Sequence, residues 1–164
     1  MSKTVDIFEY AMQMEKDGEN YYRQLAQQVA NKGLQAILIM LADEEVKHYR
    51  AIEGMRQDNY QMLETTILDD ASNIFIEMKD QKEEFEPEQE QAKLYEKAQE
   101  IEKRSQQFYQ EKANQTDKDN QKKLFEKLAK EEEKHYFLLE NIIEFVSRPK
   151  QWLENAEWYH LEEY

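Results

Sequence analysis

Apolar residues recur every three or four positions along four long segments, which is the spacing of one buried helix face. This periodicity predicts helices over about 5–30, 33–57, 88–115 and 117–146. Polar turns at 31–33 and 114–120 separate the first helix from the second and the third from the fourth. Because the 164 residues include only three glycines and two prolines, long helices are favoured over tight-turned sheets, and the predicted class is all-α.

Residues 58–87 connect the second predicted helix to the third. Apolar residues in this connection are spaced as on a helix, so a short helix is expected at about 67–78. Such a crossover lets the second and third helices run parallel, as in four-helix bundles with one long connection. We therefore expect one bundle domain over 1–148, with a C-terminal tail at 149–164 that packs on it as a short helix.

The chain contains an internal repeat, because its first half moved by 87 positions falls on its second half without a gap. Identical residues then coincide in the pairs Ala11/Ala98, Glu15/Glu102, Tyr22/Tyr109, Glu45/Glu132 and His48/His135. The chain therefore consists of two copies of one helical hairpin, at about 5–57 and 88–146.

Four glutamates and two histidines occupy positions on the apolar stripes, where core side chains are expected. They are Glu15, Glu45, His48, Glu102, Glu132 and His135. A buried carboxylate without compensation costs several kcal/mol, and four together would also repel one another. Two divalent cations would cancel the four negative charges, so the pattern predicts two metal ions in the core.

The donor set indicates which metal is bound. Carboxylates mixed with imidazoles favour iron or manganese over copper, and a calcium or magnesium site would not need the histidines. One Glu from each of two helices and Glu-x-x-His from each of the other two is the pattern of di-iron carboxylate bundles. We predict two iron ions per chain, Fe²⁺ or Fe³⁺, with manganese or zinc as substitutes and no catalytic residue beyond the ligands.

In the bundle geometry each ion has one terminal Glu and one His, in the pairs Glu15–His48 and Glu102–His135. Glu45 and Glu132 then bridge the two ions.

Two pairs of residues follow Glu15 and Glu102 on the apolar stripes of the first and third predicted helices. Tyr22 and Tyr109, two turns further on, either fill the core or hydrogen-bond the bridging carboxylates and orient them. Gly18 and Ser105, one turn further on, either permit close helix packing or leave room for a small oxidant.

Composition excludes several other classes of function. The net charge of −14 repels phosphate backbones and anionic lipid, so neither nucleic acid nor a membrane is expected as a partner. The absence of cysteine excludes disulfides, iron–sulfur clusters and thiolate zinc sites in this chain. The longest apolar run, 36–42, is too short to span a bilayer, and the N-terminus lacks a signal-peptide pattern. A soluble cytoplasmic protein is expected.

These motifs resemble the rubrerythrin branch of the ferritin-like di-iron proteins. The resemblance rests on Ala11-x-x-x-Glu15-Lys16-Asp17-Gly18-x-x-Tyr21-Tyr22 with Leu41-Ala42-x-x-Glu45-x-x-His48, and on the second copy, Ala98-x-x-x-Glu102 through Phe108-Tyr109 with Leu128-Ala129-x-x-Glu132-x-x-His135. It implies a di-iron centre that reacts with hydrogen peroxide or dioxygen and protects cells against oxidants.

The sequence departs from this family pattern in two ways. Ser105 stands where rubrerythrins have an additional Glu, which makes the site more symmetric and leaves the choice between peroxide and dioxygen open. The chain also lacks the four cysteines of a rubredoxin domain, so electrons would come from a separate donor protein such as a rubredoxin.

Three functions remain open at this point. The favoured one is an oxidoreductase that reduces peroxide or dioxygen to water as a small homo-oligomer, a dimer, since an oxidant scavenger needs no interior. The second is a ferroxidase and iron-storage protein of the ferritin–bacterioferritin type, which needs a closed cage of many subunits. The third is a structural or binding module in which bound zinc or manganese only stabilises the bundle.

Overall fold

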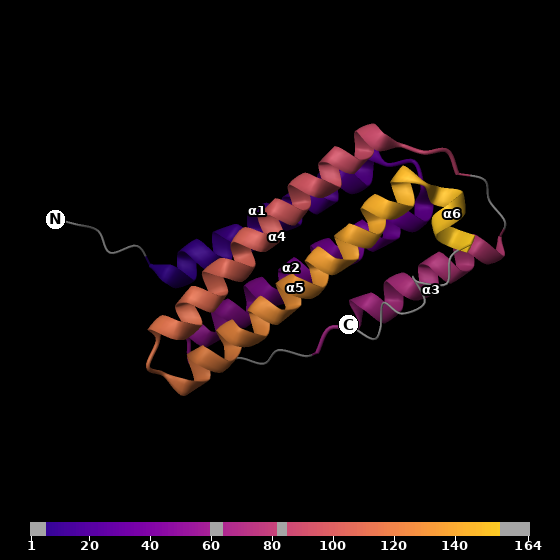
Figure 1. Cartoon of the computed structure of the whole chain (residues 1–164). Coiled ribbons are helices and arrows are strands. Elements are labelled where there is room, and N and C mark those ends of the chain that lie inside the picture. The colour runs from indigo at the N-terminus through magenta and orange to yellow at the C-terminus, as the bar shows by residue number, and fades with distance from the viewer. Residues whose placement is uncertain (1–5, 60–63, 82–84, 155–164) are drawn as a thin grey trace. The chain divides into compact units, whose positions relative to one another are not determined.

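The computed structural model describes residues 6–59, 64–81 and 85–154, and in these residues every regular element is an α-helix. The helices are α1 (Ile7–Gln28), α2 (Lys32–Arg56), α3 (Ile67–Asp80), α4 (Gln89–Gln115), α5 (Asp119–Ser147) and α6 (Pro149–Glu154) (Figure 1). The predicted all-α class is confirmed, and the five helices predicted with bounds are present, each bound lying within two residues of the prediction. The chain divides into two compact units, Met1–Glu64 and Thr65–Tyr164, which are described separately below.

The first unit is a hairpin of α1 and α2. Asp6 caps α1 by accepting hydrogen bonds from the backbone N–H groups of Phe8 and Glu9. Asn31 caps α2 in the same way, accepting from the Leu34 N–H at 3.0 Å. These caps satisfy backbone donors that have no partner within the helix, which explains where both helices begin.

The predicted apolar stripes of α1 and α2 are buried, apart from a partly exposed Phe8. The buried apolar members are Ala11, Tyr22, Leu25 and Val29 from the first stripe and Ile37, Leu38, Leu41, Ile52 and Met55 from the second.

The second unit is a hairpin of α4 and α5 on which α3 and α6 pack. Trp152 of α6 is buried, and its ring centroid lies 4.5 Å from that of Phe75 in α3 and 5.8 Å from that of Phe145 in α5. This aromatic cluster holds the start of the predicted tail against the unit as a short helix. The rest of the tail, 155–164, lies outside the described residues.

The repeat is visible at the turn of each hairpin. Helix α1 ends at Gln28 and α4 at Gln115, while α2 begins at Lys32 and α5 at Asp119. Both pairs of positions are 87 residues apart, so the two turns coincide when one hairpin is moved along the chain onto the other.

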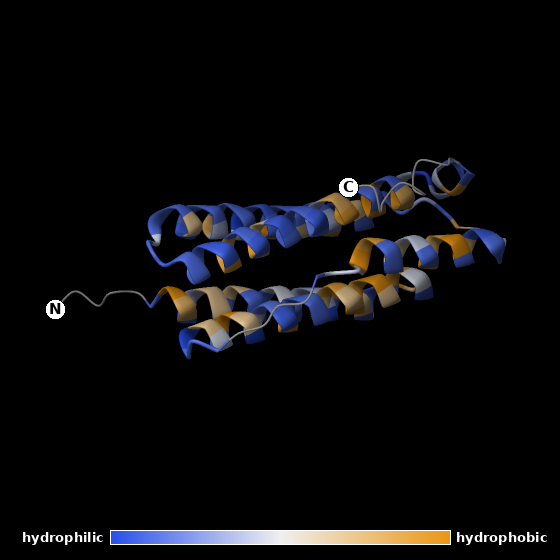
Figure 2. Cartoon of the chain, turned by 90° about the horizontal axis from the view of Figure 1, so that it is seen from below, coloured by the Kyte–Doolittle hydropathy of each residue, from blue (hydrophilic) through white to orange (hydrophobic). Residues whose placement is uncertain are grey.

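Hydrophobic and hydrophilic colours alternate along the long helices in Figure 2, as expected for helices with one buried face. Among the described helices none combines the length and the apolar composition that crossing a membrane requires.

Candidate metal centre

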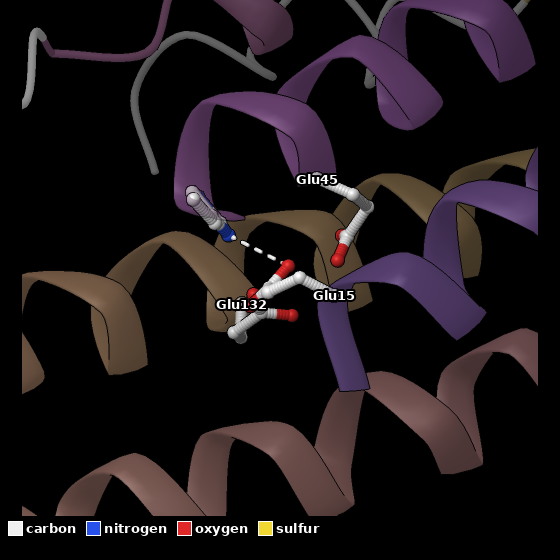
Figure 3. A group of neighbouring side chains, drawn as sticks. Glu15, Glu45 and Glu132 are labelled. Atoms are coloured by element: carbon white, nitrogen blue, oxygen red, sulfur yellow. Dashed lines mark ion pairs between the residues drawn. The ribbon is translucent and has the colours of Figure 1, made fainter. Parts of the chain in front are cut away.

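The first unit brings three of the predicted ligands together. Glu15 comes from α1, whereas Glu45 and His48 lie one turn apart on the same face of α2. All three side chains are buried, with exposed fractions of 1, 4 and 0 %. One ligand atom from each lies within 4.8 Å of the others, and the Nδ1 atom of His48 is 3.4 Å from a carboxylate oxygen of Glu15. In Figure 3 the Glu15 and Glu45 carboxylates extend from their two helices into the same space.

The second unit repeats this arrangement with Glu102 from α4 and with Glu132 and His135 from α5. These side chains are also buried, and their ligand atoms again lie within 4.8 Å of one another. The His135 Nδ1 atom is 3.5 Å from a carboxylate oxygen of Glu102. Each hairpin therefore presents the same donors in the same geometry.

The helix stripes that carry these groups are apolar one turn before and one turn after them. Leu41 and Ile52, one turn before Glu45 and one turn after His48, are fully buried, as are Leu128 and Leu139 in the second copy. Buried oxygen and imidazole donors on such stripes fit a divalent transition metal, because a cation offsets the cost of burying carboxylates. Each group is therefore one that could hold a metal ion.

Two further buried carboxylates were not singled out from the sequence. Glu44 and Glu131 directly precede Glu45 and Glu132, and each is only 4 % exposed. The Lys47 Nζ atom lies 3.3 Å from a Glu44 oxygen. The signal was present in the sequence, because the whole pair Glu44-Glu45 recurs 87 positions later.

Tyr22 and Tyr109 are buried at the expected positions, 1 % and 0 % exposed. The Tyr109 ring stacks on Phe125, with centroids 6.1 Å apart, so it contributes to core packing. The hydrogen bonds from these hydroxyls to the bridging carboxylates stay a prediction. Next to Tyr22, burial raises the pKa of the Tyr21 phenol above its usual value.

Gly18 faces Glu45 at close range. A Cβ atom at Gly18 would lie 3.0 Å from the Glu45 Oε2 atom and 3.3 Å from its Cδ atom. The glycine therefore lets the Glu45 carboxylate approach the α1 backbone more closely than any other residue would. The matching position in the second unit is Ser105, which carries a Cβ atom.

Gly18→Ala is expected to change metal affinity and metal-free stability in opposite directions. Displacement of Glu45 by a few tenths of an ångström should weaken metal binding ~10-fold, the lower end of the effects seen when groups supporting a ligand are altered. Replacing a helix-interior glycine by alanine should stabilise the metal-free protein by about 0.5–1 kcal/mol. Metal titration and thermal unfolding check the two effects. Ser105→Ala is the control, because it adds no atom, and unchanged affinity in Gly18→Ala would refute the positioning role.

Comparison with known proteins bears on the identity of these groups. A family model for rubrerythrin matches residues 6–143, a range that includes the first hairpin, most of the second and all six candidate ligands. This is a family of ferritin-like di-iron proteins, in agreement with the predicted fold class. Searches of curated proteins and of solved structures found no significant match. The family match covers most of the chain and coincides with the two buried groups, and the chain therefore belongs to the rubrerythrin family.

Proposed function

We propose that this protein is a di-iron oxidoreductase that reduces hydrogen peroxide or dioxygen to water with electrons from a separate donor protein. The observation that carries the proposal is the pair of buried groups, each with two carboxylates and one imidazole. A solvated charged face would not place these side chains at 0–4 % exposure in both copies of the hairpin.

Within this proposal each histidine would hold one ion, and its Nδ1 atom already faces a glutamate. Glu15 and His48 would hold one ion and Glu102 and His135 the other, while Glu45 and Glu132 would be ligands that both ions share. When bound, two ferrous ions supply two electrons, which with two protons convert one hydrogen peroxide to two waters.

The chain's own contribution is to fix charge and exclude solvent. Four of the buried carboxylates would balance the charge of two divalent ions, and their burial limits the number of water molecules around the reacting atoms. The hydroxyl groups of Tyr22 and Tyr109 orient the bridging carboxylates, so that little reorganisation is needed during reaction.

Anaerobic loading with Fe(II) is expected to give about two ions per chain, because the six donors form two matched sets. Stopped-flow addition of peroxide, and separately of dioxygen, should then produce ferric absorption bands. A reproducible content of one ion or none would contradict the dinuclear assignment. Ions that stay ferrous with both oxidants would exclude an oxidoreductase and favour a structural metal.

The ferroxidase and iron-storage alternative predicts the same two ions and is separated by native mass. The more symmetric site created by Ser105 favours this alternative enough to test it. We propose a homodimer. If light scattering instead showed a shell of many subunits, the result would favour iron storage.

A further inference from the structure

A cleft of about 1110 Å³ lies in the α1–α2 hairpin, and its lining includes both Glu15 and Glu45. The other lining residues include exposed side chains such as Lys16, Asp43 and Glu53. The cleft therefore connects solvent with two buried carboxylates of the candidate metal centre.

The matching face of the second unit is different. Its cleft is about half as large, about 540 Å³, and its lining contains neither Glu102 nor Glu132. The lining residues are Lys103, Gln106, Glu133, Tyr136, Phe137 and Glu140. The two copies of the hairpin thus bury similar carboxylates, and the first cleft reaches them whereas the matching cleft of the second unit does not.

One buried side chain bridges the two helices on this face of the second unit. The Gln99 amide of α4 donates to the Tyr136 carbonyl oxygen at 3.2 Å and to a Glu140 carboxylate oxygen at 2.8 Å, both in α5. Gln99 is itself buried, 7 % exposed, and its two hydrogen bonds form a bridge between α4 and α5 that we call the strap. The residue 87 positions earlier is Met12, whose thioether has no hydrogen to donate.

The partners of that strap are nevertheless present in the first unit. Tyr49 and Glu53 stand 87 positions before Tyr136 and Glu140, and both line the large cleft together with Met12. The first unit therefore has the residues that match the acceptors but has Met12 in place of the donor, and its cleft is open at that position.

In the first unit two arginines link α1 to α2 beside the cleft. Arg23 contacts Glu19 at 2.6 Å and Asp43 at 3.0 Å, and so links α1 to α2. The hydrogen bond from Arg23 lowers the pKa of Glu19. Arg56 of α2 similarly reaches Glu9 of α1 at 3.4 Å. These links tie the two helices together on either side of Met12 along the hairpin.

The charge of the lining indicates what can enter. Six acidic and five basic side chains line the cleft, so it is nearly balanced on a chain whose net charge is −14. A route for ferrous ions would be favoured by an excess of carboxylates, whereas a balanced lining suits an uncharged molecule.

We propose that the α1–α2 cleft is the entrance through which a small uncharged oxidant reaches the metal centre, and that Met12 keeps this entrance open. The identity of the oxidant rests on the proposed function. The entrance itself rests on the cleft and on the contrast between Met12 and Gln99.

Met12→Gln tests the proposal, because it places the strap residue opposite Glu53 at nearly unchanged size. The primary measurement is association of nitric oxide, an uncharged probe, with the ferrous protein under anaerobic stopped flow. We expect a rate ~10-fold below that of the unaltered protein, with Fe(II) content unchanged. Oxidation by hydrogen peroxide should slow by a similar factor, and oxidation by the bulkier cumene hydroperoxide should slow further.

Two controls separate a strap from a general disturbance. Met12→Leu keeps the site apolar and should associate with nitric oxide at the original rate. Met12→Gln combined with Glu53→Ala removes the carboxylate acceptor, which makes the shorter of the two contacts in the second unit, and should restore part of the lost rate.

Equal nitric oxide rates in Met12→Gln and the unaltered protein would overturn the entrance, as would a slow rate that Glu53→Ala does not relieve. A different result would contradict the proposed function and leave the entrance intact. If neither peroxide nor dioxygen oxidises the unaltered protein while nitric oxide still associates more slowly with Met12→Gln, the entrance stands and the redox assignment falls.

Discussion

Removal of bound metal is expected to lower the free energy of unfolding by about 4 kcal/mol for each ion, when the comparison is made at a free metal concentration 1,000 times the Kd. The reason is that the folded chain gathers two carboxylates and one imidazole in each hairpin, whereas the unfolded chain does not. For a chain of this size each kcal/mol shifts the unfolding temperature by about 2–4 °C, so a drop of roughly 8–16 °C for each ion is expected.

Circular dichroism during heating measures this difference, with zinc as a metal that has no redox chemistry. Calcium is the control ion, because it prefers all-oxygen sites and should stabilise much less. Identical unfolding temperatures with zinc and with a chelator would show that these side chains bind no metal in the folded state.

Glu45→Ala is expected to reduce the metal content from about two ions to below one, whereas His48→Ala should leave about one. The difference follows from the proposed roles, because a bridging carboxylate serves both ions and a histidine serves one. Elemental analysis after dialysis against a fixed Fe(II) concentration gives the two numbers.

The repeat supplies internal replicates of this experiment. Glu132→Ala should behave like Glu45→Ala, and His135→Ala like His48→Ala, because the second hairpin has the same donors and distances. Glu44→Ala is the matched control, since Glu44 is equally buried yet has no proposed bond to an ion. Loss of a single ion in both Glu45→Ala and His48→Ala would show that Glu45 is a terminal ligand.

Much of this arrangement could be predicted because helix periodicity reports burial directly. Glu45 and His48 occupy the same stripe as Leu41 and Ile52, and the structure buries all four. Helix ends were predictable for a similar local reason, as the Asn31 cap shows.

Other features depend on contacts between helices, which periodicity does not encode. Whether Gln99 reaches Glu140, and hence closes one face, depends on how α4 packs against α5. Glu44 lies at the edge of its stripe, where spacing alone does not distinguish a buried carboxylate from a solvated one.

The coincidence of the two hairpin turns has an evolutionary consequence. A single hairpin carries half of the six donors, so an ancestral peptide could have supplied all of them as a pair of identical copies. Such a pair must carry the same residue at both matched positions, and any opening would occur twice. Fusion into one chain removes that constraint, because one copy can keep Met12 while the other acquires Gln99. One hairpin can then admit a small molecule while the face of the other stays closed, and the six ligands are unchanged.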